Sequence, residues 1–560
     1  MTTLRVGQLR ARYRVPAAPP EARRRLDEIL HGLVDDALEE ALSEAGVPAT
    51  EEICIRNVSV PVRLGLGSPD SALSRAWGNA LASSIRKTVE VGGPNIARYV
   101  NRAHALADML ACLAAGDYRR AWAWRQLGIW GLGDDPPPAA AADQAVRALL
   151  GQPDAITATV ASVAEEGGLP ALVRLIPPGS WLALAEAASA AASVTPSAVR
   201  HLVGWASRPV NERDSLESPD PDVSRAEPGP VAETARAEHD PRADDLSREW
   251  VAASRIVRTS LIARAIGGVP APHPEVRAAL RILALLEAEP SLLSGPAEKA
   301  ARVFALLREV AVPRRSQRRQ RVGSTGLDDA AAARPSGREQ PTEPSLPTSG
   351  VTASSADRPG GTAPRTDTSP SAEVLQPEVG EGSPELPLPA LPPAARTEGG
   401  GLLFLLHLVE SAGILEAVAN GAYLSSRGLR WVLHQLAMRL LDLPADDPAA
   451  LAFAGLAPDR AAPSLGEADA TREEEEELAL FADRLMAAFR ERLARSGAQD
   501  VLDPLPLLRR DAHVVASPGW IDVVLDLEQT DIDIRRAGLD LDPGWLPWLG
   551  VVVRFVYEQA

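Results

Sequence analysis

The sequence predicts a mainly α-helical chain with a small α+β unit at the N-terminus, a small β unit at the C-terminus and two long disordered linkers. Apolar residues recur at helical spacing over most of the chain, alternate only near its two ends, and are scarce in two proline-rich stretches. The expected parts are an α+β domain, a helical domain, a linker, a helical segment, a second linker, a second helical domain and a β unit, at residues 1–92, 95–206, 207–247, 248–312, 313–399, 400–497 and 510–560.

Two stretches near the N-terminus alternate apolar and polar residues, which is typical of half-buried strands. Residues 4–15 place arginines on one face and apolar side chains on the other. Residues 53–66 repeat the alternation, and Pro61 indicates an edge position or a bulge because proline has no N–H to donate. The sequence therefore predicts a strand in each stretch.

A helix is predicted after each of these strands. The first helix has an apolar face from Leu26 to Leu42, and Gly46 stands where a C-terminal capping glycine is expected. The second begins at Ser68-Pro69-Asp70, because serine is a favoured N-cap and proline is favoured at the first helical position. Its predicted inward face consists of Leu73, Trp77, Leu81, Ile85 and Val89. The N-terminal domain is thus predicted to follow the order strand-helix-strand-helix.

Helical spacing dominates the middle of the chain apart from the first linker. Residues 102–133 predict two helices joined by a turn at Gly116-Asp117, with their three tryptophans as packing anchors. Residues 207–247 and 313–399 have too few apolar residues to offset the entropy of ordering. The sequence leaves open whether residues 95–312 form one helical unit or two.

Helices return after the second linker and give way to strands at the end of the chain. Residues 399–419, 428–443 and 471–497 have helical spacing, and the last of these begins with glutamates and ends with arginines, as the helix dipole favours. The glutamates at 473–477 are interpreted as a solvated helix start. Strands are predicted at His513–Val515, Trp520–Leu527 and Val551–Tyr557.

The composition argues against several classes of protein. A net charge of −17 argues against general nucleic-acid binding. Only two of the 58 basic residues are lysines, Lys87 and Lys299, a bias typical of GC-rich bacterial genomes. The longest apolar run, 402–409, is far too short to span a bilayer, and the N-terminus does not resemble a signal peptide. A cytoplasmic protein with no membrane span is expected.

The sequence lacks the patterns that carry most enzymatic chemistry. Neither lysine lies in a phosphate-binding loop, and there is no GxSxG, HExxH or CxxC motif. Cys54 and Cys112 form no metal or disulfide framework, and the histidines occur singly. The aspartates of residues 531–542 suit turn capping better than calcium, because Val551 stands where an EF-hand loop needs glutamate. No catalytic residue, cofactor or metal is expected, and an enzyme is the minority hypothesis.

Three blocks, in this order, resemble the tape measure proteins of contractile injection systems, which are phage-tail-like bacterial machines with an inner tube inside a contractile sheath. The first block, residues 26–66, is similar to that family's N-terminal helix followed by a strand. The second, residues 399–456, is similar to its glycine-leucine-leucine segment with a second helix and a short acidic loop. The third, residues 519–555, resembles its terminal Gly-Trp strand and Leu-Pro-Trp motif, here Gly519-Trp520 and Leu546-Pro547-Trp548.

The resemblance implies a structural protein that helps to set or nucleate inner-tube assembly. Its expected partners are tube, baseplate or cap proteins, and incorporation into the assembled particle is a further expectation. Under this hypothesis the linker 313–399 separates two folded ends that bind assembly components, so that shortening the linker shortens the tube. The alternative from another class is a non-enzymatic helical adaptor that joins partners through flexible linkers.

The candidate partner-binding residues lie in the terminal segment and are Trp520, Trp545, Leu546, Pro547 and Trp548. Pro543-Gly544 suits a tight turn and Pro547 stiffens the exit, which would hold the tryptophans at 545 and 548 in a fixed geometry. Rigid tryptophans are good interface anchors because little entropy is lost when they bind. The alternative is that both tryptophans cover the core of the terminal β unit.

Overall fold

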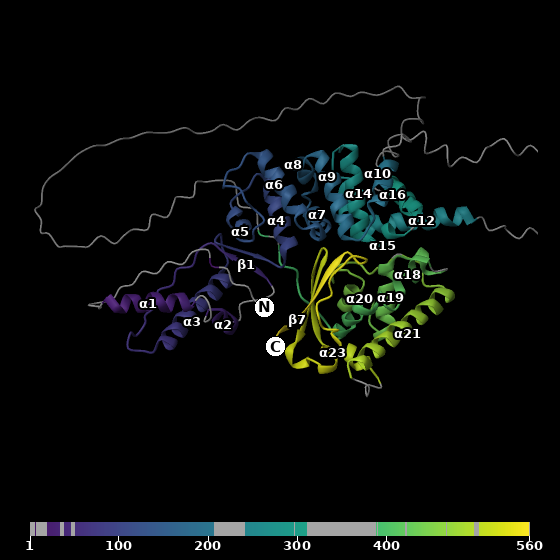
Figure 1. Cartoon of the computed structure of the whole chain (residues 1–560). Helices are drawn as coiled ribbons and strands as arrows, with labels where there is room; N and C mark the ends of the chain where they lie inside the picture. The colour runs from purple at the N-terminus through teal and green to yellow at the C-terminus, as the bar shows by residue number, and fades with distance from the viewer. Residues whose placement is uncertain are drawn as a thin grey trace, which may run out of the picture. The chain divides into compact units, whose positions relative to one another are not determined.

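The structure, a computed structural model, consists of an N-terminal segment, a helical domain and a C-terminal domain (Figure 1). It describes residue 6 and residues 20–33, 38–45, 51–206, 241–270, 272–295, 297–310, 388, 390–420, 423–465, 467–497 and 503–558, which all fall in one compact unit. The described chain is mainly helical, with a small sheet near each end, as the sequence predicts. The predicted strand 4–15 (apart from Val6), Gly46 and most of both predicted linkers lie outside the described residues.

The N-terminal segment contains three helices and two short strands: α1 (Pro20–Gly32), α2 (Leu38–Glu44), β1 (Glu52–Ile55), α3 (Asp70–Val91) and β2 (Ile96–Tyr99). β1 and β2 pair antiparallel, with Cys54 opposite Ala97. Leu26 and Leu42, at the two ends of the predicted apolar face, are both buried. α2 and α3 share a small core of their own, whereas Cys54, Ala97 and Tyr99 belong to the core of the helical domain.

Three predictions for this segment are wrong in detail. The strand predicted at 53–66 ends at Ile55, because β2 is only four residues long and pairs no further along the chain. β2 itself lies where a helix was predicted. α3 begins at Asp70 with Pro69 as its N-cap and no side-chain cap, so Ser68 does not have the predicted capping role.

The helical domain is built around a single core. Its elements are α4 (Arg102–Ala115), α5 (Ala121–Gln126), α6 (Pro138–Leu150), η2 (Pro153–Ala155), α7 (Ile156–Glu165), α8 (Leu169–Leu175), α9 (Pro178–Ala191), α10 (Pro196–Ala206), α12 (Pro241–Thr259), α13 (Leu261–Ile266), α14 (Pro274–Ala288), α15 (Ser291–Ser294) and α16 (Ala297–Val310). The helices predicted at 95–206 and 248–312 therefore form one unit, in which α9 packs on α14. α12 begins inside the predicted linker 207–247, because its later turns bury Ala253 and Ile256 in this core.

The two helices predicted in residues 102–133 are confirmed as α4 and α5. Gly116 ends α4 in the left-handed conformation, with a φ of 73°. The rings of Trp124 and Trp130 are both buried and meet edge to face at 5.9 Å, and Trp122 packs against the same core. The three tryptophans are packing anchors, as predicted.

The C-terminal domain combines the predicted helical domain 400–497 and the predicted β unit 510–560 around one core. Its elements are β3 (Ala395–Thr397), η4 (Gly400–Leu408), α18 (Ile414–Asn420), η5 (Leu424–Ser426), α19 (Leu429–Leu441), α20 (Pro448–Phe453), α21 (Arg472–Arg495), α22 (Leu505–Leu508), β4 (Ala512–Ser517), β5 (Trp520–Asp526), η6 (Leu527–Gln529), α23 (Ile532–Ala537), β6 (Gly544–Leu546) and β7 (Val551–Glu558). β3 lies inside the predicted linker 313–399, and the start of the predicted helix 399–419 is a 3-10 helix.

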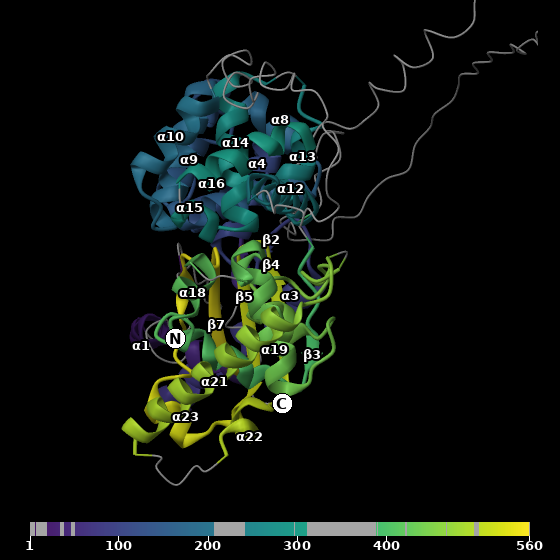
Figure 2. The ribbon, with the colours of Figure 1, turned by 90° about the vertical axis from the view of Figure 1, so that its right-hand side faces the viewer.

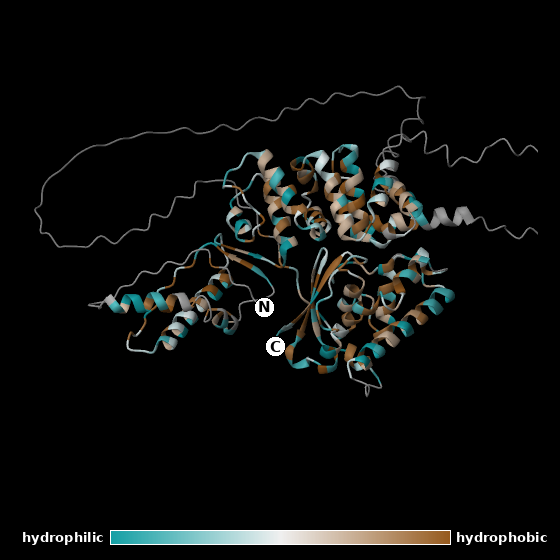
Figure 3. Cartoon of the chain, in the orientation of Figure 1, coloured by the Kyte–Doolittle hydropathy of each residue, from teal (hydrophilic) through white to brown (hydrophobic). Residues whose placement is uncertain are grey.

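The five strands form one sheet in the order β3-β4-β5-β7-β6. Within this sheet, β5 and β7 are neighbours and run parallel. Helices α18, α19 and α21 lie over one face of this sheet (Figure 2). α21 is the predicted amphipathic helix, and Thr471 and Glu474 form a capping box at its start. The apolar residues of α21 lie on the side that faces the sheet, and hydrophilic residues lie on its outer side (Figure 3). The helix thereby covers apolar side chains of the sheet, as a layered domain requires.

Candidate partner-binding groove

Four of the five candidate residues come together in the structure. Trp545, Leu546, Pro547 and Trp548 line a groove of about 700 Å³ between the C-terminal domain and the helical domain. Leu415 and Val418 of α18, and Leu292 of α15, add to its apolar wall. The two tryptophans form an aromatic wall, and charged side chains, among them Glu298, Lys299 and Arg302, line much of the rest.

Trp520 is the candidate that lies elsewhere. It begins β5, where its indole N–H donates to Asp522 at 3.0 Å. The guanidinium of Arg554 stacks over its ring at 4.8 Å, and the same arginine makes two hydrogen bonds to Asp522 at 2.7 and 2.9 Å. Trp520 therefore belongs to a cross-strand cluster on β5 and β7 and does not contribute to the groove.

The turn-rich segment at the groove takes its position from β6. This edge strand pairs antiparallel with β7, so that Leu546 faces the core and is buried. The indole N–H of Trp545 donates to the carbonyl of Ala191, at the end of α9, at 2.8 Å. Trp548 is half-buried against the C-terminal core. Trp545 thus joins the two domains, a contact that sequence reasoning missed because its partner lies 354 positions away.

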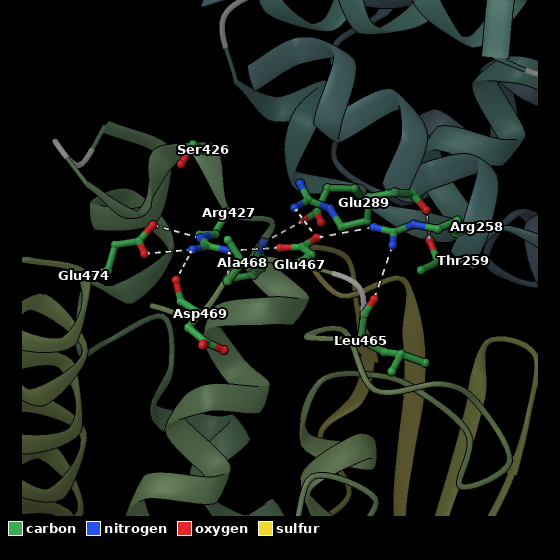
Figure 4. A network of polar contacts seen from close by, with 12 residues as sticks. Arg258, Thr259, Glu289, Ser426, Arg427, Leu465, Glu467, Ala468, Asp469 and Glu474 are labelled. Atoms are coloured by element: carbon green, nitrogen blue, oxygen red, sulfur yellow. Dashed lines mark hydrogen bonds and ion pairs between the residues drawn. The ribbon is translucent and has the colours of Figure 1, made fainter. Parts of the chain in front are cut away.

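A network of buried charges lies beside the groove (Figure 4). Arg427, between η5 and α19, makes two hydrogen bonds to Glu474, at 2.8 and 2.9 Å. It also donates to the carbonyls of Ala468 and Asp469, and its guanidinium lies 4.5 Å from the centre of the Trp431 ring. These contacts fix the loop before α21 to the start of α19.

The network crosses from the helical domain to the C-terminal domain at several points, two of which are buried. Arg255 of α12 pairs with Glu467 at 3.2 Å. Glu289, at the end of α14, accepts from the backbone N–H of Leu429 at 2.9 Å. A Cβ on Gly428 would clash with the Glu289 carboxylate and come within 3.0 Å of Arg255, so a larger residue here would displace the ends of these two side chains.

Arg430 makes a further buried connection between the domains. Its Nη2 donates to the carbonyl of Glu287 at 2.7 Å and to that of Leu549 at 3.1 Å. The side chain of Glu287 accepts from the backbone N–H groups of Leu261 and Ile262, and so caps α13. Burial lowers the pKa of Arg430, but the two nearby glutamates favour its charged form.

The prediction that the glutamates at 473–477 are solvated is wrong for Glu474. This side chain is only 7% exposed because Arg427, which lies 47 positions earlier, folds against it. Burial raises the pKa of Glu474, but the hydrogen bonds from Arg427 and from the backbone of Thr471 outweigh it, so that the pKa lies below its ordinary value.

Replacing Arg427 with glutamine is expected to destabilise the C-terminal domain by about 2 kcal/mol at neutral pH, because Glu474 loses its charge-assisted hydrogen bonds. Since the pKa of Glu474 is lowered by folding, its contribution is present above its ordinary value of 4.5 and is lost as pH falls through the folded pKa. Urea unfolding at pH 7 and at pH 3 should therefore show a difference between wild type and variant that shrinks in acid.

The matched control is Arg439→Gln, because Arg439 pairs with Glu475 at 3.3 Å with both side chains about half exposed. Its stability is expected to differ from wild type by less than about 0.5 kcal/mol. An Arg427→Gln effect no larger than that of Arg439→Gln at pH 7 would contradict a stabilising role for the buried pair.

Other chemistry-bearing side chains have structural partners. Burial, with a smaller contribution from Glu52, raises the pKa of Cys54 to about 12, and both cysteines are buried. Asp531 caps α23, and Asp542 accepts from the backbone of Phe555. Among the described residues, no cluster of three or more histidine, cysteine or carboxylate side chains could hold a metal ion. Within the same ranges, none of the helices has the length and apolar character needed to cross a bilayer.

Comparisons of the chain with models of known protein families, with curated proteins and with solved structures found no match.

Proposed function

We propose that the chain is a non-enzymatic assembly protein of a phage-tail-like contractile injection system, tape-measure-like in kind, that helps to nucleate inner-tube assembly. The observation that carries the proposal is the packing of the second and third resembling blocks. They lie more than sixty positions apart in sequence, yet both contribute to the core of the C-terminal domain. Phe404 of the second block meets Phe555 of the third with ring centroids 5.1 Å apart.

The groove is the surface that best fits a partner in this proposal. The Leu-Pro-Trp motif of the third block forms one wall, and α18 of the second block forms part of another. Tryptophan, proline and leucine side chains held by a packed core lose little entropy on binding. The proposed partners are tube, baseplate or cap proteins, with the chain cytoplasmic before it joins the particle.

The contacts between the two domains change how such a protein would act. The linker hypothesis needs two folded ends whose separation depends on residues 313–399. The segments on either side of this linker contact each other directly through Arg255 and Glu467 and through Lys299 and the carbonyl of Ser425. A longer or shorter linker leaves these contacts in place, so we propose nucleation by the folded unit in place of measurement by the linker.

Deleting residues 330–369 is therefore expected to leave both the melting temperature and the tube length of assembled particles nearly unchanged. Halving a loop alters the entropy of loop closure by only about 0.6 kcal/mol. Thermal unfolding of the purified chain and electron microscopy of particles would check the two parts. Shorter tubes in the deletion strain would restore the linker as the ruler.

Electron microscopy of particles from cells with and without this gene tests the proposal itself. Loss of particles, or tubes of uncontrolled length, is the expected result. A Trp548→Ala strain should reproduce the defect, whereas a Trp520→Phe strain should not, because Trp520 lies outside the groove. Normal particles in cells that lack the whole gene would favour the helical adaptor hypothesis instead.

A further inference from the structure

We propose that the groove beside Trp545 and Trp548 receives a segment of a partner protein that carries an arginine next to apolar residues. This rests on the proposed function, in which the groove is the partner surface, and adds the chemistry of the segment that fits there. Three features of the groove point to a basic segment: its aromatic wall, the bonds of its own basic side chains, and the position of its exposed carboxylates.

The aromatic wall suits a cation as well as an apolar side chain. Trp545 and Trp548 are both half-buried, so part of each indole remains open to solvent in the groove. The hydrogen bond from Trp545 to the carbonyl of Ala191 holds its ring in place. A guanidinium is attracted to the face of an aromatic ring, and tryptophan binds cations more strongly than tyrosine or phenylalanine does.

The same domain shows how a carboxylate and a tryptophan hold an arginine together. The guanidinium of Arg554 lies 4.8 Å from the centre of the Trp520 ring while it bonds Asp522 at 2.7 Å. Arg427 lies 4.5 Å from the centre of the Trp431 ring and also bonds a carboxylate. An arginine supplied by a partner would find the same two kinds of group in the groove.

The basic side chains at the groove are already held by this chain. Each donates a hydrogen bond to another residue, the pairs being Arg255 with Glu467, Arg302 with Glu249, Arg427 with Glu474 and Lys299 with the carbonyl of Ser425. The carboxylates of the first three pairs are at most 7% exposed, so water screens these pairs little. An acidic partner segment would compete with these acceptors.

The exposed carboxylates lie on both walls of the groove. Glu298 stands in the first turn of α16 in the helical domain, and Glu410 precedes α18 in the C-terminal domain. Both side chains are exposed, and neither forms an ion pair with any residue that the structure describes. The uncompensated charge at the groove is therefore negative, which favours a positively charged partner. Arginine suits this groove best because its planar guanidinium both stacks on aromatic rings and bonds carboxylates.

Three capped hexapeptides test the proposal on the full chain. All have the sequence Ala-Leu-X-Pro-Leu-Ala, where X is arginine, glutamate or citrulline, which has nearly the shape of arginine but no charge. Fluorescence anisotropy of labelled peptides is expected to show that the arginine peptide binds at least about fivefold more tightly than the citrulline peptide. The glutamate peptide should bind most weakly. The double variant Glu298→Gln with Glu410→Gln should remove the preference for arginine over citrulline.

The matched control is Glu275→Gln. Glu275 is also exposed and also stands in the first turn of a helix of the helical domain, α14, but it does not line the groove. This variant should keep the preference for the arginine peptide. Circular dichroism should show wild-type folding in the control and in the double variant, because all three changes are at exposed positions.

Several results would overturn the proposal. These are equal affinity for the three peptides, an unchanged preference in the double variant, and binding of the arginine peptide only after residues 314–321 are deleted, which would assign the groove to the chain's own arginine-rich segment. A preference for arginine together with normal particles in cells that lack the gene would support the basic partner while contradicting the contractile-system proposal. Loss of particles together with equal peptide affinities would support the assembly role and overturn the basic partner.

Discussion

Replacing Asp108 with alanine is expected to destabilise the helical domain by about 3–5 kcal/mol, because it leaves Arg120 charged and buried without its carboxylate. Asp108 is 2% exposed and Arg120 is 4% exposed, with Nη1 of the arginine 2.5 Å from Oδ1. The other carboxylate oxygen accepts from the hydroxyl of Tyr99 at 2.8 Å and from the indole of Trp124 at 3.0 Å. One side chain therefore ties β2, α4 and α5 together.

Two variants separate the buried charge from other causes. Asp134→Ala removes an ion pair with Arg125 in the same domain, but Asp134 is 79% exposed, so a change below about 0.5 kcal/mol is expected. The double variant Asp108→Leu with Arg120→Met is expected to recover much of the stability, because no isolated charge remains. Urea unfolding followed by circular dichroism measures all three, and a double variant as unstable as Asp108→Ala would show that packing, not charge, sets the cost.

The sequence predicted those elements whose spacing, caps and charges all lie within one short segment. α21 is an example, since its apolar spacing, its capping threonine and its charge gradient all lie within residues 471–497. The strand at 53–66 is the converse example. Its alternation is present in the burial of residues 57–66, but whether a strand forms depends on a partner, and β2 stops at Ile96. Pairing over a long sequence distance cannot be read from alternation alone.

The candidate groove was only half predictable for the same reason. The stiff segment around Trp545 and Trp548 was visible because prolines and glycines mark it locally. The charged residues beside the groove could not be predicted, because partners such as Arg255 and Glu467 are 212 positions apart in the sequence. A run of glutamates predicts a solvated helix start on average, and nothing within the run distinguishes Glu474 from its neighbours.

Replacing Gly401 with alanine is expected to destabilise the C-terminal domain by about 3 kcal/mol or more, because η4 meets α22 backbone to backbone at this residue. A Cβ on Gly401 would lie 2.5 Å from the carbonyl oxygen of Leu507 and 2.9 Å from the Cα of Leu508. Neither atom can rotate away as a side chain would. Gly204→Ala is the control substitution, since no atom lies within 4 Å of its Cβ position and α10 should gain up to about 1 kcal/mol in helix propensity.

This close backbone contact explains why glycine stands at position 401, within the block that resembles the tape measure family. η4 carries Phe404, which contacts Phe555 on β7, and β7 in turn pairs with β6 beside Trp545. Separating η4 from α22 should therefore loosen the contacts that lead to the groove, and the Gly401→Ala variant should lose folding stability and, under the proposed function, particle assembly. A change in stability below about 1 kcal/mol, measured by urea unfolding, would show that the two backbones part easily and that the glycine at position 401 needs another explanation.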